Sequence, residues 1–309
     1  MSSSGDLTLV TGAGGGVGGV GRTVVESLIG RGRAVRAMAH HDDRRADALR
    51  GLGADVVVGD LTRPTDVARA LDGAHRMFFG MSVSPSYLEA AATVATVARS
   101  LGGLEILVDI SQMTVSQMDA LSSEESRQQR LHWLSEQLLD WSGLPVAHIR
   151  PTIFLDNPLF TVLAARSIAE RDTIELPFGR GRTSPIAAED VARVVTAVLD
   201  DPGPHIGQVY ELTGPRSQDM TGVAEEFSGA LRRHISYVDV SPDEWADKVL
   251  SRAELGSHVE QHLATMARLH RRHRYDRSTR TVERITGRPA QSIEEFVARH
   301  AGIFQRQDE

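Results

Sequence analysis

Short apolar runs alternate with segments of helical periodicity through the first half of the chain. The run Leu7–Thr11 stops at a glycine cluster, and apolar residues then return at helical spacing from Val24 to Ile29. The same order repeats as far as Arg150. We expect strands at 34–39, 55–60, 75–80, 104–111 and 146–150, and helices at 47–52, 67–71, 87–101 and 126–141. This alternation predicts a parallel sheet with helices on both faces.

The alternation weakens after Pro151. A turn-rich break covers 179–185, and the tail 242–304 has a mostly helical pattern. Between them we expect helices at 190–199 and 221–231 and a strand at 209–212. No Pro-, Gly- or Ser-rich linker separates the halves. We therefore expect residues 1–150 to form an α/β domain, and residues 151–309 to form a smaller, mainly helical region that completes the sheet and covers the cleft at its ligand edge.

Charge and composition exclude several classes of protein. The net charge of −7 gives no basic surface for a nucleic-acid backbone, and the arginine-rich run 268–274 is short. Because the chain has no cysteine, it has no disulfide, no thiolate nucleophile and no cysteine zinc site, and we expect no metal. The start lacks a secretory signal pattern, and no apolar stretch approaches the ~20 residues of a membrane span. We therefore expect a cytoplasmic protein that binds neither nucleic acid nor membrane.

Glycines recur at every third position between the first strand and the first helix, at Gly12, Gly15, Gly18 and Gly21. Glycine lets the backbone approach a pyrophosphate, whose charge then meets N–H groups and the positive end of the helix. A glycine cluster alone is a weak signal. In a strand–loop–helix unit, however, it predicts a Rossmann-type, doubly wound sheet that binds a dinucleotide.

The end of the second strand carries basic side chains. The acidic residue that selects NAD, expected ~20 residues after the loop, is absent from this strand end. His40 and His41 stand there instead, and Arg44 and Arg45 follow after Asp42 and Asp43. Basic groups favour a 2′-phosphate, so NADP(H) is favoured over NAD(H). The alternative is that these arginines are solvated loop charges.

Segments along nearly the whole chain together match one family. They are Val10–Ala13, Val57–Thr62, Ser142–Pro145, Ile149–Phe154 with Asn157, Gly181–Pro185, Asp190–Ala192, Tyr210–Pro215 and Thr286–Pro289. Together these segments resemble the NmrA-like, atypical short-chain dehydrogenase/reductase group, which includes triphenylmethane-reductase and quinone-oxidoreductase-like members.

The resemblance implies roles for particular residues. Thr11 and the glycines would form the phosphate loop, and Asp60 and Leu61 would lie beside the adenine. The nicotinamide ribose would be lined by Phe79, Gly80 and Met81, and the substrate would contact Gln112, Phe154 and Asn157. About three extra residues after Ala13 depart from the family. The phosphate contacts therefore come either from positions 12, 15 and 18 or from positions 15, 18 and 21.

The Tyr-x-x-x-Lys pair of ordinary short-chain reductases cannot form in this chain. In that pair the lysine lowers the pKa of the tyrosine, which hands a proton to the forming alkoxide. Lys248 is the only lysine here, and Glu244 stands four residues before it. At the positions where the resemblance expects lysine and tyrosine, the chain has His132 and Gln128.

Two other residues are candidates for catalysis. The segment His132–Glu136 resembles the His-x-x-Thr-Glu stretch of the triphenylmethane-reductase-like members. His132 would therefore donate a proton or contact the ribose, unless it is a structural histidine. Ser111 ends the fifth strand, where the family places its active-site serine. It would orient a carbonyl oxygen, unless it only caps the strand.

These features predict an NADPH-dependent reductase that transfers a hydride to a small aromatic, quinone-like or polyketide-type carbonyl or conjugated acceptor. The alternative is an NmrA-like, NAD(P)-binding redox sensor without turnover. A hydrolase or transferase has little support, because the chain has no Gly-x-Ser-x-Gly elbow and no Gly-Lys-Ser/Thr loop. We expect a small-molecule partner, and the sequence leaves monomer and homodimer open.

Overall fold

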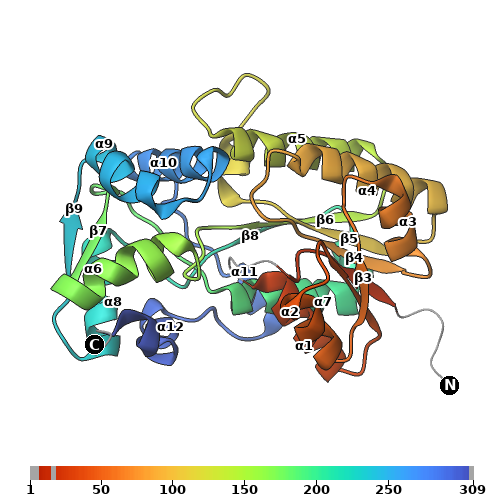
Figure 1. Cartoon of the computed structure of the whole chain (residues 1–309), viewed down its shortest axis with the longest axis horizontal. Helices are drawn as coiled ribbons and strands as arrows, with labels where there is room; N and C mark the ends of the chain where they lie inside the picture. The colour runs from red at the N-terminus through yellow and green to blue at the C-terminus, as the bar shows by residue number, and fades with distance from the viewer. Residues whose placement is uncertain (1–6, 15–18, 306–309) are drawn as a thin grey trace.

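The computed structural model describes residues 7–14 and 19–305, and a seven-stranded sheet forms its centre (Figure 1). The strand order is β3-β2-β1-β4-β5-β6-β8, and every neighbouring pair is parallel. The strands are β1 Thr8–Val10, β2 Val35–Ala39, β3 Asp55–Val58, β4 Arg76–Phe79, β5 Ile106–Ile110, β6 Val146–Pro151 and β8 Val209–Leu212. The predicted α/β class and the parallel sheet are confirmed.

The strand order reverses at β1, which lies between β2 and β4. The chain runs outward from β1 through β2 to β3, and then returns to the other side of β1 as β4. In doubly wound sheets, ligands bind at the carboxyl ends of the strands beside such a reversal. The residues that follow β1 and β4 therefore border the expected dinucleotide site.

Helices cover both faces of the sheet, as Figure 1 shows. One face carries α3 (Pro64–Leu71), α4 (Tyr87–Leu101) and α5 (Arg127–Trp141), packed through a core that includes Val67, Val94 and Leu139. The other face carries α1 (Val20–Gly30), α2 (Arg44–Gly51), α7 (Ala188–Asp200) and α11 (Thr281–Thr286), packed through Val25, Leu49 and Val195. The bounds of α4 equal the predicted range 87–101.

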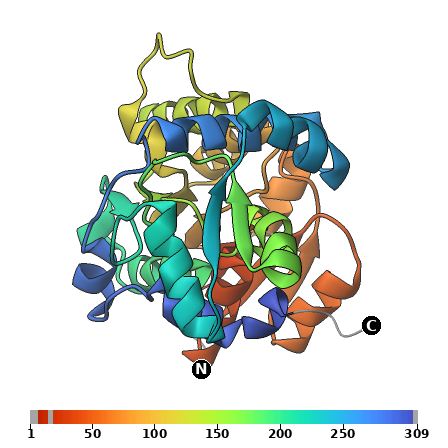
Figure 2. The same cartoon turned by 90° about the vertical axis from the view of Figure 1, so that its left-hand side faces the viewer.

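A second core lies beyond β6. Figure 2 shows β7 (Thr173–Leu176) beside β9 (Ser236–Asp239), a parallel pair surrounded by helices. Large side chains fill this core, including Phe160, Phe227 and Trp245. Its α-helices are α6 Ala165–Arg171, α8 Met220–Leu231, α9 Pro242–Trp245, α10 Ser257–Arg271 and α12 Ile293–Arg299. Shorter helical turns are η1 Met113–Gln117, η2 Leu159–Ala164, η3 Gly203–His205, η4 Ala246–Leu250, η5 Ser251–Ala253 and η6 Ala301–Phe304.

The sequence pattern did not predict β7 and β9. Each strand has four residues and pairs only with the other, so the contact that stabilises them joins segments far apart in the chain. The predicted strand 209–212 is present as β8 and forms one edge of the main sheet. Over the described ranges, no helix is both long and apolar enough to cross a membrane.

Candidate active site

A cavity of about 350 Å³ opens at the carboxyl edge of the sheet. Its wall includes Gly12 after β1, Gly80 after β4, Ser111 after β5 and Thr152 after β6. Residues of α10 and the residue Leu255 before it also line the cavity. In the described part of the chain, no Asp, Glu, Lys or Arg side chain lines it. The cavity therefore suits an uncharged and largely apolar ligand.

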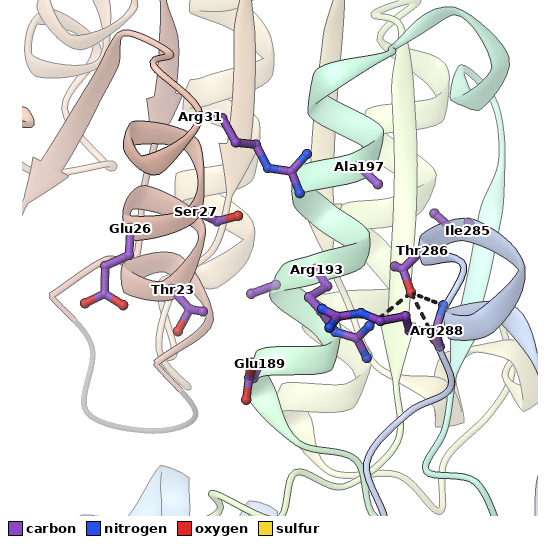
Figure 3. Close-up of a pocket in the computed structure, with 11 residues that line it drawn as sticks. Thr23, Glu26, Ser27, Arg31, Glu189, Arg193, Ala197, Ile285, Thr286 and Arg288 are labelled. Carbon is purple, nitrogen blue, oxygen red and sulfur yellow. Dashed lines mark hydrogen bonds between the residues drawn. The ribbon is translucent and has the colours of Figure 1, made fainter.

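A larger hollow of about 600 Å³ lies between α1, α7 and the turn after α11 (Figure 3). Two of its arginines already have partners: Arg31 binds Asp200 at 2.6 Å, and Arg193 binds Thr286 at 3.2 Å. None of the residues predicted for catalysis or for cofactor binding lines this hollow. The smaller cavity is therefore the candidate site.

The turn after β1 is pressed against the end of β4. The Thr11 hydroxyl donates to the Gly80 carbonyl at 2.8 Å and accepts from the Gly80 N–H at 2.9 Å. Gly12 has a φ of +71°, and a Cβ there would lie 2.7 Å from the Gly80 oxygen. Thr11 therefore fixes the loop through its hydroxyl, and the close approach requires glycine at position 12.

Helix α1 starts beside this turn. A Cβ on Gly21 would lie 2.9 Å from the Ala13 nitrogen, so Gly21 lets the helix pack against the loop. Gly12 and Gly21 both line the cavity, whereas Gly15 and Gly18 lie outside the described residues. The N–H groups and the positive end of α1 suit a pyrophosphate. Which glycines contact the phosphates stays a prediction.

Asp43 organises the basic segment after β2. Its carboxylate caps α2, because it accepts from the Arg45 N–H at 2.9 Å and from the Ala46 N–H at 3.4 Å. It also pairs with the Arg45 guanidinium at 2.7 Å, and its bonds to Arg45 lower the pKa of Asp43 to about 2. Arg45 in turn donates to the Gly14 carbonyl at 3.2 Å. Arg45 thus ties α2 to the glycine loop, while the exposed side chain of Arg44 bonds to no other described residue.

The residues predicted to lie near the adenine follow two neighbouring strands. His40 is exposed at the end of β2, and its ring lies 4.3 Å from that of His41. Asp60 follows β3, where its carboxylate accepts from the Thr62 N–H at 2.9 Å, and this bond lowers the pKa of Asp60. Leu61 packs partly into the core. Since β2 and β3 are paired, these residues share one edge of the sheet.

The structure differs from the expectation at Phe79. Gly80 and Met81 line the cavity, but the Phe79 side chain is fully buried against Tyr87, with ring centroids 5.7 Å apart. Its neighbour Phe78 lines the cavity instead. Side chains alternate along a strand, so Phe78 and Phe79 face opposite sides of the sheet. Phe79 is a core residue here, and its side chain does not border the cavity.

Ser111 stands in the cavity wall with an unused hydroxyl. The residue is 5% exposed, and its Oγ has no hydrogen-bond partner among the residues the structure describes. Only its backbone N–H is bonded, to the Ile149 carbonyl at 2.7 Å. The cap alternative therefore has no side-chain bond to support it. The free hydroxyl is available to a ligand.

His132 projects from α5 into the same cavity. Its Nε2 lies 3.1 Å from the amide nitrogen of Gln128, and its ring packs against Tyr87 with centroids 4.1 Å apart. Its Nδ1 is buried without a partner among the described atoms. Burial, helped by the charge of His262, lowers the pKa of His132 to about 3. At neutral pH the ring is neutral, which favours a hydrogen-bond donor over an imidazolium acid.

Tyr87 does not replace the missing acid. Its hydroxyl donates to the Ile110 carbonyl at 2.9 Å, and burial raises its pKa well above the usual value. The three predicted substrate contacts, Gln112, Phe154 and Asn157, all line the cavity. The Asn157 side-chain oxygen accepts from the Leu159 N–H at 2.9 Å, which fixes the Asn157 amide at the start of η2.

Sequence reasoning expected the C-terminal region to cover the cleft, but it did not identify the residues of α10 that line it. Val259, His262, Leu263 and Met266 line the cavity, and Tyr275 beyond the helix does so too. Their spacing gives the helix an apolar face, which the sequence shows. Nothing in that pattern indicates that the face meets residues that follow strands more than a hundred positions earlier.

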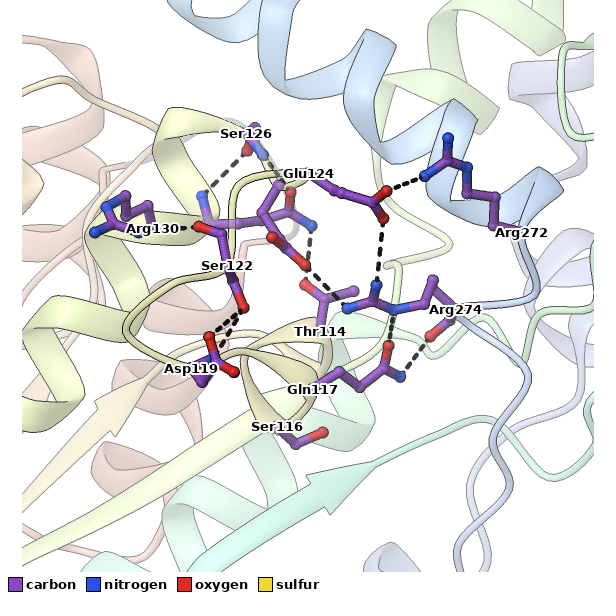
Figure 4. Close-up of polar contacts among 12 residues, drawn as sticks. Thr114, Ser116, Gln117, Asp119, Ser122, Glu124, Ser126, Arg130, Arg272 and Arg274 are labelled. Atoms are coloured by element: carbon purple, nitrogen blue, oxygen red, sulfur yellow. Dashed lines mark hydrogen bonds and ion pairs between the residues drawn. The ribbon is translucent and has the colours of Figure 1, made fainter.

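The segment between β5 and α5 is fastened to the C-terminal region (Figure 4). The Arg274 guanidinium donates to the Glu125 carboxylate at 2.9 Å and also to the side-chain oxygen of Gln117. The Arg274 backbone carbonyl accepts from the Gln117 amide nitrogen at 2.9 Å. Arg272 binds Glu124 at 2.7 Å. The Ser126 hydroxyl lies 2.7 Å from Nδ1 of His262. These bonds fix the segment that begins with Gln112 against α10.

A network of charged side chains joins β5, β6 and α5. His148 contacts Asp109 at 2.8 Å and Asp140 at 3.1 Å, and Glu136 pairs with Arg150. Burial opposes the charged ring, but these carboxylates outweigh it and raise the pKa of His148 to about 9. Asp109, Glu136 and His148 have metal-ligating atoms within 4.8 Å of one another. Because both ring nitrogens and Glu136 already have charged partners, ion pairing accounts for the cluster.

The chain is similar to curated reductases over nearly its full length. The NAD(P)H azoreductase of Xenophilus azovorans is 28% identical over 296 residues, which cover 94% of this chain and 97% of that protein. The (4-alkanoyl-5-oxo-2,5-dihydrofuran-3-yl)methyl phosphate reductase of Streptomyces griseus is 28% identical over 298 residues, which cover 96% and 99%.

Solved structures share the fold. Escherichia coli quinone oxidoreductase QOR2 in complex with NADPH superposes with a TM-score of 0.81 at 21% identity, covering 96% of this chain and 99% of the other. Citrobacter triphenylmethane reductase gives 0.80 at 18% identity, covering 95% and 98%. NmrA, a negative transcriptional regulator in complex with NADP, gives 0.77 at 18% identity, covering 96% and 95%.

The family model described as NAD(P)H-binding matches residues 15–202, more than half of the chain. This range contains the strands β2 to β6 and the cavity residues that follow β4, β5 and β6. The fold neighbours agree with the resemblance read from the sequence segments. The chain therefore belongs to the NAD(P)H-binding family.

Proposed function

We propose that the protein is an NADPH-dependent reductase that transfers a hydride to a small, uncharged aromatic, quinone-like or polyketide-type carbonyl or conjugated acceptor. One observation carries this proposal. Beside the glycine loop, the cavity has no charged lining side chain in the described residues, yet four of its lining residues have unpartnered polar atoms: the hydroxyls of Ser111, Thr152 and Tyr275, and Nδ1 of His132. A few uncharged polar groups in an apolar wall suit a neutral acceptor with few polar atoms to be bound.

The cofactor and the acceptor would be held by different parts of the chain. Residues 1–150 supply the glycine loop and the ends of β1, β2 and β4, which would hold NADPH. Residues 151–309 complete the sheet through β8 and supply the α10 wall, which would cover the acceptor. The bound nicotinamide would supply the hydride, and the apolar wall would exclude water.

The side chains would bind and orient the acceptor. Ser111 and the neutral His132 would donate hydrogen bonds to its polar atom, where negative charge develops as the hydride arrives. Gln112, Phe154 and Asn157 would fix the ring system in the cavity. The ring of His132 is neutral, the Tyr87 hydroxyl is engaged, and burial raises the pKa of Tyr275. The protein would therefore act mainly through positioning and hydrogen bonding, and water would supply the proton that the anion takes up after the hydride.

The names of the relatives support a reductase, and one of them raises the question whether the acceptor has a phosphate group. The azoreductase, the quinone oxidoreductase and the triphenylmethane reductase carry the names of reductases. The Streptomyces relative is named for a phosphate ester. No arginine or lysine among the described residues lines the present cavity, so we propose an acceptor without a phosphate group.

A panel of paired acceptors tests the proposal. NADPH oxidation is followed with neutral quinones, aromatic ketones and azo compounds, and with a sulfonated or phosphorylated form of each. We expect the neutral member of a pair to be reduced with the higher kcat/KM. Reduction of none of them, or a preference for the anionic members, contradicts the proposal.

A redox sensor without turnover is the second candidate. The absent Tyr-x-x-x-Lys pair and the fold shared with the regulator NmrA favour it. Titration with NADP⁺ and with NADPH separates the two candidates. A sensor distinguishes the two redox states and oxidises NADPH with no acceptor of the panel.

A further inference from the structure

The side-chain amide of Gln128 has a defined orientation. Gln128 is fully buried on α5, and the backbone N–H of Ser84 donates to its Oε1 at 3.1 Å. A backbone N–H can only donate, so the atom that it meets is the amide oxygen. The amide nitrogen therefore points away from Ser84.

That amide nitrogen faces His132. It lies 3.1 Å from Nε2 of the ring, one helical turn along α5. An amide nitrogen donates and does not accept, so Nε2 of His132 must accept with its lone pair. In a neutral imidazole the single proton is then on Nδ1. This is the buried atom that has no partner among the described residues.

His258 completes the arrangement from the other half of the chain. Its Nε2 lies 2.8 Å from the same Oε1 of Gln128. Because the oxygen only accepts, His258 donates, and the oxygen receives two donors. His258 is half-buried near the start of α10, the helix that lines the cavity. The ring of Tyr87 packs against His132. Turning the His132 ring over would keep this packing but would put a carbon in place of Nε2 beside Gln128, so the hydrogen bond favours the observed orientation.

We propose that Gln128 is a positioning residue that holds His132 in the tautomer with its proton on Nδ1, and that His258 holds the amide in place. This proposal rests on the proposed function, because Nδ1–H is then the donor offered to the acceptor. The acceptor must present a lone pair there, as a carbonyl, a quinone or an azo group does. The opposite tautomer would turn a lone pair towards the acceptor's lone pair.

The variant Gln128→Glu tests the arrangement while keeping its shape. A carboxylate still accepts from Ser84 and His258, but it has no proton to donate to His132. We expect the proton of His132 to move to Nε2. Nitrogen-15 NMR of histidine-labelled protein shows which ring nitrogen carries the proton. The His132 signals are assigned by their absence in His132→Gln.

Turnover is measured on the same proteins. We expect kcat of Gln128→Glu to fall about 10²-fold, the scale for removing one donor from a developing negative charge, with the Kd of NADPH unchanged. Gln129→Glu is the matched control. Gln129 is equally buried on α5, but it binds Ser126 and Thr114 and not His132, so its variant should keep the proton of His132 on Nδ1.

His258→Ala provides a second variant. Ser84 still holds the amide oxygen there, so the proton should stay on Nδ1 while kcat falls only a few-fold. Protonation of His132 at Nε2 in the unaltered protein overturns the proposal, and so does a shifted proton with unchanged kcat. The NMR result stands by itself if no acceptor is reduced. In that case the proposed function fails, and the tautomer is still decided.

Discussion

Arg44 and Arg45 are adjacent residues with different surroundings. Arg45 is held by Asp43 and by the Gly14 carbonyl, whereas the side chain of Arg44 is exposed and bonds to no other described residue. An exposed ion pair such as Arg45–Asp43 contributes little to stability. The two arginines therefore offer a bound 2′-phosphate one side chain that is free and one that must first leave a partner.

We expect Arg44→Ala to weaken NADPH binding about tenfold or more, since a hydrogen bond to a charged group contributes about 1.5–3 kcal/mol. NADH binding should be unchanged. Arg45→Ala should weaken both cofactors through the glycine loop. Calorimetric Kd values for each variant and for the double variant give the comparison. An equal loss of both cofactors in Arg44→Ala would rule out the 2′-phosphate role.

The neutral ring of His132 makes a prediction about pH. Because burial holds its pKa at about 3, the ring stays neutral above that pH and loses no proton between pH 5 and 8. We expect His132→Ala to lower kcat about 10²-fold at every pH in this range, without changing the shape of the pH profile. A step near pH 6.5 that disappears in His132→Ala would instead identify an imidazolium acid.

At the scale of elements, the junction of β1, α1 and β4 depends on backbone contact. A side chain at position 12 would need a left-handed backbone, which costs about 1–2 kcal/mol, and would overlap the Gly80 oxygen. We expect Gly12→Ala to lower the free energy of unfolding by more than about 2 kcal/mol and to weaken NADPH binding. Gly14→Ala is the control, since a Cβ there has no neighbour within 4 Å among the described residues. Denaturant titration compares the two, and equal stabilities would contradict the packing argument.

The network that joins β5, β6 and α5 gives stability a dependence on pH. The folded pKa of His148, about 9, lies above its ordinary value of 6.5. The protonated His148 ring therefore makes its full contribution to stability below pH 6.5, and this contribution is lost as the pH rises through 9. We expect the free energy of unfolding to fall on the order of 1–3 kcal/mol between pH 6.5 and 9.5. In His148→Gln this decrease should be absent, although the variant is less stable throughout because Asp109 loses its partner. A decrease of equal size in the variant would assign it to other groups.

At the scale of the whole molecule, local pattern predicted the sheet but not the contacts between its two halves. The helix 87–101 and the strand 209–212 were predicted with the observed bounds, because strong periodicity and turn residues mark them. The pattern did not predict which side of the sheet each residue faces: we expected Phe79 at the cofactor, but Phe78 lines the cavity and Phe79 is buried in the core. The bond between Gln128 and His258 joins residues 130 positions apart, and only the folded chain brings them together.

The cavity wall from α10 predicts separate control of the two ligands. Val259 lines the cavity from this helix. The predicted cofactor contacts, by contrast, come from the glycine loop and from the end of β2, in the first half of the chain. We expect Val259→Ala to change the acceptor KM several-fold and to leave the Kd of NADPH unchanged. Arg268→Ala, on the exposed face of the same helix, should change neither value. A loss of NADPH affinity in Val259→Ala would show that the two sites are coupled.

The placement of α10 also bears on how such a protein could acquire new substrates. Val259, Leu263 and Met266 follow one another at single-turn spacing along α10, and Leu255 lies just before the helix; all four line the cavity. Replacing these few residues would change the shape of the space offered to the acceptor, while the central sheet and the predicted dinucleotide contacts would stay the same. A library confined to this stripe would therefore sample new acceptors in a chain that still folds, and a hit would need no compensating change in the first half of the sequence.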